Sequence, residues 1–189
     1  MKLIQISSDC QEATNYRASA ENYLRNRTSK FFGAHPDEVI IRQLLPSDIG
    51  LKQWQFVSRA KEETCFVKYL LASSAVLEFR KVIIIYKIVI DPREDKKLGI
   101  VKLRRGVGGP TTLGIIDISP LYLPVGVRKK EGSELAEYTY LPQAYLDNPV
   151  VYDPSEVIDI VVEALSAGTY TLMLEGYVGE AQSYVGEAL

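Results

Sequence analysis

Histidine is the side chain on which most nucleophilic catalysis depends, and this chain has only one. His35 precedes Pro36 in the segment GAHPDE. A catalytic triad requires a histidine beside a serine or cysteine nucleophile, whereas a histidine in a proline-containing segment of this kind is typical of an exposed turn. We therefore expect no catalytic residue and no enzymatic activity.

The two cysteines offer little material for a metal site. Cys10 and Cys65 lie in unrelated surroundings without a CxxC spacing, so a zinc ion would find almost no ligands. We expect two reduced thiols, and a single disulfide between them is the alternative that the sequence leaves open. No metal ion or other cofactor is expected.

The segment KLRRGVGGPTT, residues 102–112, is the one candidate for binding a phosphate group. Its glycines, next to Arg104 and Arg105, could present backbone N–H groups and guanidinium groups to an anion. However, it lacks the GK[ST] ending of a P-loop, and no helix is expected after it to add a dipole. The pattern favours a glycine-rich turn that links two strands.

Charge is distributed unevenly along the chain. The first 130 residues hold all 22 lysines and arginines and 13 of the 24 acidic residues, a net charge of +9, whereas the remaining residues hold 11 acidic residues and no base. Two arrangements fit this pattern. Either the charges interleave where strands distant in sequence pair, or they form complementary basic and acidic surfaces that join copies head to tail.

A basic patch would form if the turns that carry most of the central lysines and arginines lay at one end of the sheet. These residues are Lys96, Lys97, Lys102, Arg104, Arg105, Arg128, Lys129 and Lys130. Few aromatic residues lie among them, so stacking on nucleic-acid bases has little support and nucleic acid is an unlikely partner. In the acidic third, Asp159 and Glu163 are interpreted as a solvated strand face rather than an acid–base pair.

One amphipathic helix is predicted over residues 9–32. Asp9 and Glu12 resemble a capping box, and Gly33 is expected to end the helix. The apolar stripe predicted for it comprises Tyr16, Ala20, Tyr23, Leu24 and Phe31. Arg25 and Arg27 lie off this stripe, so the helix is a basic arm that either covers its own domain or docks on a neighbouring copy.

The most apolar stretch, FRKVIIIYKIVID at 79–91, predicts a buried strand. Its period of two predicts one core face and a mixed opposite face that includes Lys81, Ile83 and Lys87. The predicted core face comprises Val82, Ile84, Tyr86, Ile88 and Ile90. Residues 98–105 are expected to pair with this strand as a hairpin.

Short apolar runs separated by proline and glycine fill the rest of the chain. Strands are expected within 36–45, 54–58, 66–71, 111–117, 121–127 and 138–141. The last two strands, near 158–164 and 169–178, alternate between apolar and polar residues around Ser166-Ala167-Gly168, and they predict a hairpin. We expect Ile84, Ile88, Ile160, Leu172 and Leu174 to be buried together.

These elements predict an all-β protein: an antiparallel, jelly-roll-like β-sandwich over residues 36–189, preceded by an arm and helix over residues 1–35. Hydrophobic content of 47% and charged content of 24% are those of an ordinary globular domain. The N-terminal segment lacks the apolar core of a secretory signal, and no stretch is long enough to span a membrane, so synthesis inside the cell is expected.

This combination of a basic N-terminal arm, short strands and a closing strand AGTYTLMLEGYV resembles the single jelly-roll structural proteins of virions. The resemblance covers residues 36–178 and implies a capsid, turret or appendage subunit that assembles in many copies, alone or with other structural proteins, with the virion as its location. The candidate assembly contacts are Arg25, Arg27, Arg128, Lys129, Lys130, Tyr177 and Tyr184. The alternative is a ligand-binding β-sandwich module, for carbohydrate or peptide, that uses Trp54 and exposed tyrosines.

Overall fold

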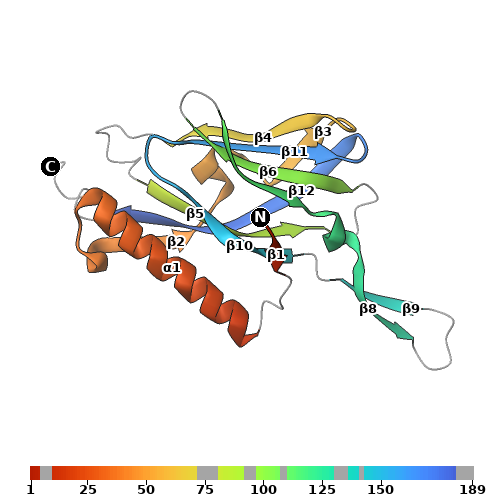
Figure 1. Cartoon of the computed structure of the whole chain (residues 1–189), viewed down its shortest axis with the longest axis horizontal. Coiled ribbons are helices and arrows are strands. Elements are labelled where there is room, and N and C mark those ends of the chain that lie inside the picture. The colour runs from red at the N-terminus through yellow and green to blue at the C-terminus, as the bar shows by residue number, and fades with distance from the viewer. Residues whose placement is uncertain are drawn as a thin grey trace.

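The computed structural model describes residues 1–4, 10–71, 81–91, 97–106, 110–129, 136–140 and 143–181. Two antiparallel sheets pack face to face, and one long helix lies against the outer face of the larger sheet (Figure 1). The predicted fold class, an all-β sandwich with an N-terminal helix, is therefore confirmed. None of the helices in the described segments is both long and apolar enough to cross a membrane.

The elements follow each other as printed here. They are β1 (Leu3–Ile4), α1 (Gln11–Phe32), η1 (Pro36–Glu38), β2 (Val39–Gln43), η2 (Pro46–Ile49), β3 (Gln55–Ser58), β4 (Glu63–Leu70), β5 (Lys81–Ile90), β6 (Leu98–Arg105), β7 (Thr111–Asp117), η4 (Ser119–Tyr122), β8 (Pro124–Lys129), β9 (Ala136–Tyr140), β10 (Gln143–Tyr152), β11 (Val157–Ala164) and β12 (Gly168–Ala181).

The strands pair in the nested order of a jelly roll. The larger sheet has the order β1-β10-β5-β12-β2, with β3 also paired to β12, and the smaller sheet has the order β4-β11-β6-β7. Thus β6 pairs with β7, β5 with β10, β4 with β11, and β2 and β3 with β12. The chain is one long antiparallel ribbon rolled into two sheets, which is the jelly-roll arrangement.

Two predicted hairpins are wrong because of this nesting. β5 pairs with β10 and β12, whereas β6 lies in the other sheet between β11 and β7. β11 and β12 also lie in opposite sheets, although both strands were correctly located. Residue alternation predicts which face of a strand meets the core, and it does not predict which strand lies beside it.

The central strand β5 is buried on both faces, which corrects the prediction of one core face. Val82, Ile84 and Tyr86 face α1, whereas Ile83 and Ile85 face the space between the sheets. The register shifts at Tyr86 in the pairings with both neighbours. Such a bulge exchanges the two faces of a strand, so Ile88 and Ile90 join the inner core instead of continuing the face of Ile84.

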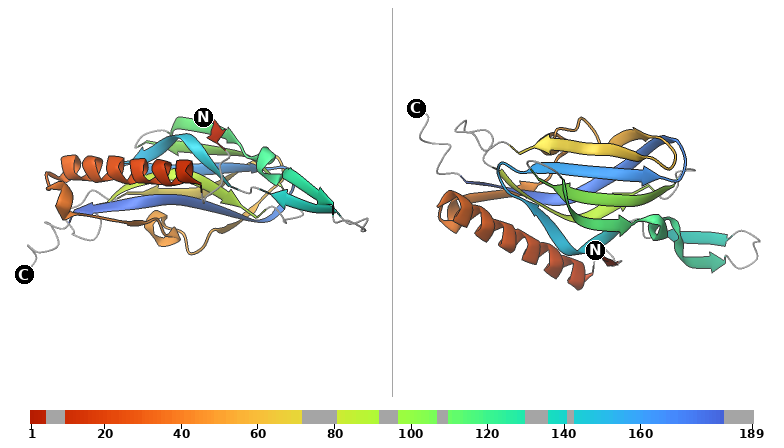
Figure 2. Two further views of the ribbon diagram at one scale, coloured as in Figure 1. Left: turned by 90° about the horizontal axis from the view of Figure 1, so that it is seen from below. Right: turned by 45° about the horizontal axis from the view of Figure 1, so that its top comes forward.

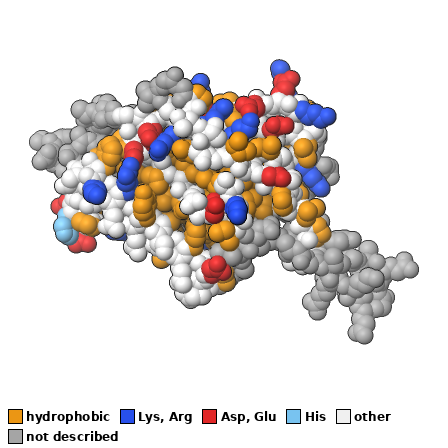
Figure 3. Space-filling model, viewed as in Figure 1, with side chains coloured by type: hydrophobic (Ala, Val, Ile, Leu, Met, Phe, Trp, Pro, Cys, Tyr) orange, Lys and Arg blue, Asp and Glu red, His pale blue; other side chains and the backbone are white. Residues whose placement is uncertain are grey.

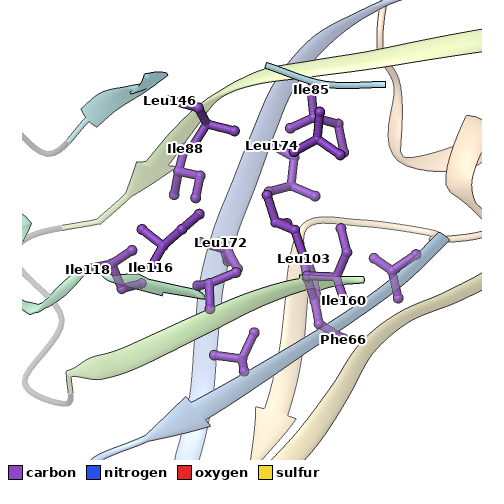
Figure 4. Packing of buried hydrophobic residues seen from close by; sticks show 14 of the residues in the cluster. Phe66, Ile85, Ile88, Leu103, Ile116, Ile118, Leu146, Ile160, Leu172 and Leu174 are labelled. Atoms are coloured by element: carbon purple, nitrogen blue, oxygen red, sulfur yellow. The ribbon is translucent and has the colours of Figure 1, made fainter. Parts of the chain in front are cut away.

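The inner core lies between the two sheets. Figure 4 shows Ile88, Leu172 and Leu174 of the larger sheet opposite Ile160 and Leu103 of the smaller one. Four of the five residues expected to be buried together do meet here, whereas Ile84 belongs to the second cluster under α1. On β12, Tyr170, Leu172, Leu174 and Val178 are buried as the alternation predicted.

Helix α1 forms the second cluster with the outer face of the larger sheet. Its buried residues are Ala13, Ala20, Leu24 and Thr28. The predicted stripe is therefore wrong at Tyr23 and Phe31, which are 53% and 49% exposed. Small residues allow the helix to approach the sheet closely, because a Cβ on Gly179 of β12 would collide with Oγ1 of Thr28.

Both ends of α1 are capped. The N-cap is Cys10, whose Sγ accepts a hydrogen bond from the N–H of Ala13 at 3.4 Å, and this replaces the predicted Asp9 cap. At the C-terminus Gly33 has φ +67°, and its N–H bonds the carbonyl of Ser29. This left-handed cap confirms the predicted end of the helix.

A buried ionic network ties β2, β5 and β12 to η2. Arg42 bonds both carboxylate oxygens of Asp48 at 2.6 Å, and Lys81 contacts Asp48 at 3.0 Å. Glu180 of β12 contacts Arg42 at 2.9 Å and Lys81 at 3.6 Å. Burial alone would raise the pKa of Asp48, but hydrogen bonds from Arg42, the N–H of Leu45 and Lys81 outweigh it and lower this pKa to about 2.

Truncating the inner core tests the packing described above. Leu172→Ala should cost about 2–5 kcal/mol of unfolding free energy, because Leu172 is completely buried between the sheets. The neighbouring Met173 is partly exposed, and Met173→Ala should change stability by only about 0.5 kcal/mol. Urea unfolding followed by circular dichroism measures both values, and equal effects would contradict the assigned face of β12.

The Asp48 network predicts a pH-dependent contribution to stability. Because the folded pKa lies below the unfolded value of 3.8, the contribution is present above about pH 4 and disappears as the pH falls towards 2. Asp48→Asn should lose on the order of 2 kcal/mol at pH 7. Urea unfolding at several pH values should show the two proteins converging as the pH falls below 4. A constant difference would contradict the lowered pKa.

Candidate functional site

The charged residues of the two parts of the chain interleave. Acidic residues after position 130 form ion pairs with bases before it, namely Asp153 with Arg27, Glu156 with Arg105, Asp159 with Arg104, Glu175 with Lys87, and Glu180 with both Arg42 and Lys81. Figure 3 accordingly shows basic and acidic side chains intermixed on one face. Within the described segments, separate basic and acidic ends are therefore not found, and the interleaved alternative fits.

The predicted assembly contacts on α1 bind other parts of the same chain. Arg25 donates to the carbonyl of Val39 at 2.7 Å and pairs with Glu21 at 3.3 Å. Both terminal groups of Arg27 bond the carboxylate of Asp153, which follows β10. These bonds fix the C-terminal half of α1 to the sandwich, and contacts of Arg25 or Arg27 with another copy stay a prediction.

Tyr177 belongs to a layer of tyrosines beneath α1. Its ring lies 5.1 Å from that of Tyr86, which is 6.2 Å from Tyr145, and Tyr16 of the helix lies 5.1 Å from Tyr145. Burial raises the pKa of Tyr16 to about 12, and burial with a hydrogen bond to Tyr177 raises the pKa of Tyr86 well above its ordinary value. These phenols stay protonated at neutral pH, so the layer supplies packing and hydrogen bonds.

The remaining assembly candidates concern β8 and the C-terminal segment. Arg128 and Lys129 lie on β8, whereas Lys130 and Tyr184 fall outside the described residues. β8 and β9 form a two-stranded ribbon of their own, and in the described part of the chain neither pairs with the sandwich. Figures 1 and 2 show this ribbon projecting from one end of the molecule.

The ribbon has an alternating register. Val127 lies opposite Tyr138 and Arg128 lies opposite Glu137. Because residues directly opposite each other share a face, the Val127 and Tyr138 positions define an apolar face and the Arg128 and Glu137 positions a polar one. The ribbon is an insertion between β7 and β10, so the jelly roll itself closes without it.

The residues considered for chemistry lie apart from one another. His35 caps η1, accepting a hydrogen bond from the N–H of Asp37, and its imidazole is largely exposed. Cys10 and Cys65 are free thiols. The glycine-rich segment joins the paired strands β6 and β7, as expected, and residues 107–109 of it fall outside the described part. No group of three or more metal-ligating side chains is found among the described residues.

An apolar groove runs beside α1. It has a volume of about 310 Å³ and is lined by residues of the helix and of β10 and β5, including Tyr16, Tyr23, Ile84, Pro149 and Val151. In Figure 3 hydrophobic side chains form a band across this face of the molecule. The irregular register of β10 between Tyr145 and Val150 opens the groove. Its lining is suited to apolar contact and holds no acid–base pair.

A more polar pocket of about 290 Å³ opens at the outer edge of β12. Its wall includes Trp54, Leu45, Met173, Glu175 and Tyr86. Beneath it, the Nζ atom of Lys87 lies 3.1 Å from Oε2 of Glu175 and 5.3 Å above the ring of Tyr145. Lys87 is only 3% exposed, whereas the Glu175 side chain is 34% exposed and reaches the pocket. Sequence analysis selected Trp54 as a binding residue, and it missed both members of this ion pair.

Comparison with known proteins adds no relative to this description. The chain matches no protein family, no curated protein and no solved structure.

Proposed function

We propose that this protein is a non-enzymatic structural subunit that self-assembles, and that the β8–β9 ribbon is its assembly arm. The observation that carries the proposal is the ribbon itself, which projects from the sandwich and pairs with no other described strand. The ribbon includes Arg128 and Lys129, two of the candidate assembly contacts.

The energetics of a two-stranded ribbon support this role. An isolated hairpin is marginally stable in water, because neither face is covered. A ribbon whose register provides an apolar face at Val127 and Tyr138 gains stability when a second molecule covers that face. A contact between the ribbon of one copy and the body of another is heterologous, and it generates rings or extended arrays. Shells and appendages are built from such contacts.

The jelly-roll fold is compatible with the proposal but does not carry it. Double-sheet jelly rolls occur in viral capsid proteins and also in lectins and enzymes, so the fold alone does not select a function. The resemblance to virion structural proteins makes a capsid, turret or appendage subunit our proposed context. Because the described charges pair within the subunit, we propose that apolar contact contributes more to assembly than complementary charge.

Removing the ribbon tests the proposal. Pro124 and Tyr140 face each other in the register, so a Gly-Ser-Gly linker in place of residues 125–139 closes the chain without strain on the sandwich. Light scattering after size-exclusion chromatography should give the wild type as a multiple of 21.2 kDa and the shortened variant as a monomer. The point variant Val127→Asp should also dissociate, because it places a charge on the apolar register face.

Two controls make this experiment decisive. His35→Ala changes an exposed residue far along the chain from the ribbon and should assemble like the wild type. All variants should keep the wild-type circular dichroism spectrum, because the ribbon contributes no strand to either sheet. A wild type that stays monomeric up to about 100 µM, far above the Kd of a stable complex, contradicts self-assembly. A shortened variant that still assembles contradicts the role of the ribbon.

Salt separates the apolar contribution from the ionic one. Screening shortens from about 10 Å at 0.1 M salt to about 3 Å at 1 M, so an assembly held by charges would weaken between these concentrations. We expect the wild-type oligomer to persist at 1 M, as sedimentation velocity would show. Marked dissociation at high salt would instead favour complementary charged surfaces that include Arg128 and Lys129.

A further inference from the structure

The outer edge of β12 is interrupted between two partner strands. β2 pairs with residues 177–181 of β12 and β3 pairs with residues 168–171. The N–H of Leu172 bonds the carbonyl of Trp54, and the carbonyl of Gly176 accepts from the N–H of Leu44, each at 3.0 Å. These two bonds mark the ends of a gap in the sheet edge.

Leu174 lies at the centre of this gap. Backbone groups along a strand point alternately to its two sides, so those of Leu174 point to the same side as those of Leu172 and Gly176. In the described part of the chain, neither β2 nor β3 has a residue paired with Leu174. One backbone N–H and one carbonyl are thus available at the floor of the pocket that Leu174 lines together with Trp54.

The polar and apolar groups of this pocket lie close together. Trp54, Leu45 and Met173 provide apolar surface, and Leu45 and Met173 are exposed at the rim. Gln43 and Glu175 provide an amide and a carboxylate. Because Lys87 contacts the carboxylate from the interior, the charge of Glu175 is compensated while the exposed part of its carboxylate can still accept hydrogen bonds.

We propose that this pocket binds a saccharide through a single sugar ring. A sugar has an apolar C–H face that packs on an aromatic ring and hydroxyl groups that donate to a carboxylate or carbonyl and accept from an amide. A volume of about 290 Å³ is at the lower end of the range for small-molecule sites and suits one ring.

Other classes of ligand fit less well. A cation is disfavoured because Lys87 already neutralises Glu175. An extended peptide binds a sheet edge through several successive backbone groups, and the gap offers those of one residue. The pocket lies on the sandwich, whereas the proposed assembly arm projects from it, so this inference does not depend on assembly.

Trp54 gives a direct readout because it is the only tryptophan in the chain. The full-length protein is titrated with glucose, galactose, mannose, N-acetylglucosamine and N-acetylgalactosamine up to about 50 mM, which covers a millimolar Kd. At least one sugar should change the emission of Trp54 saturably. If none of the five does so, the proposal is overturned.

A blocking variant locates the binding site. Met173→Arg places a long charged side chain at the rim while keeping Trp54, and it should raise the Kd of the responding sugar at least about tenfold. The matched control is Val57→Arg on β3, where Val57 is 71% exposed and does not line the pocket. It should bind like the wild type. Equal Kd values for the wild type and both folded variants would overturn the assignment to this pocket.

Discussion

The close approach of β5 and β12 is the constraint on which the rest of the sandwich depends. A Cβ on Gly176 would collide with the carbonyl oxygen of Ile84, so only glycine allows the two strands to meet at this point. The register shifts here, and the extra residue on β5 is Tyr86. As a result one strand serves two cores, with Ile84 under the helix and Ile88 between the sheets. The same shift places Lys87 opposite Glu175, at the floor of the pocket.

The local elements could be predicted from the sequence, but their pairing could not. Alternation located β12 and β11 and their buried residues, and Gly33 located the end of α1, because these signals depend on neighbours in sequence. The jelly roll instead pairs strands from opposite ends of the chain, so that β2 and β3 contact β12. Strand β10 escaped prediction because Asp147, Asn148 and Pro149 interrupt its apolar pattern, and its register is irregular at that point.

The candidate sites were predictable only in part, for the same reason. Trp54 could be selected because tryptophan is rare and amphipathic. Lys87 and Glu175 could not be connected, because they are 88 positions apart and meet only through the pairing of β5 with β12. The charge imbalance along the chain was correctly observed, yet nested pairing converts most of it into ion pairs within the subunit, such as Arg42 with Glu180.

Association and stability depend on different parts of this molecule. The inner core, the layer under α1 and the Asp48 network all lie in the rolled ribbon of strands, which is complete when β7 connects to β10 by any path. The β8–β9 insertion occupies that path and adds no strand to either sheet. An arm that the core does not need is free to adopt the sequence that a partner surface requires. The Trp54 pocket differs, because Glu175 and Lys87 also belong to the central pair of strands, so its polar groups are held rigidly before any ligand arrives.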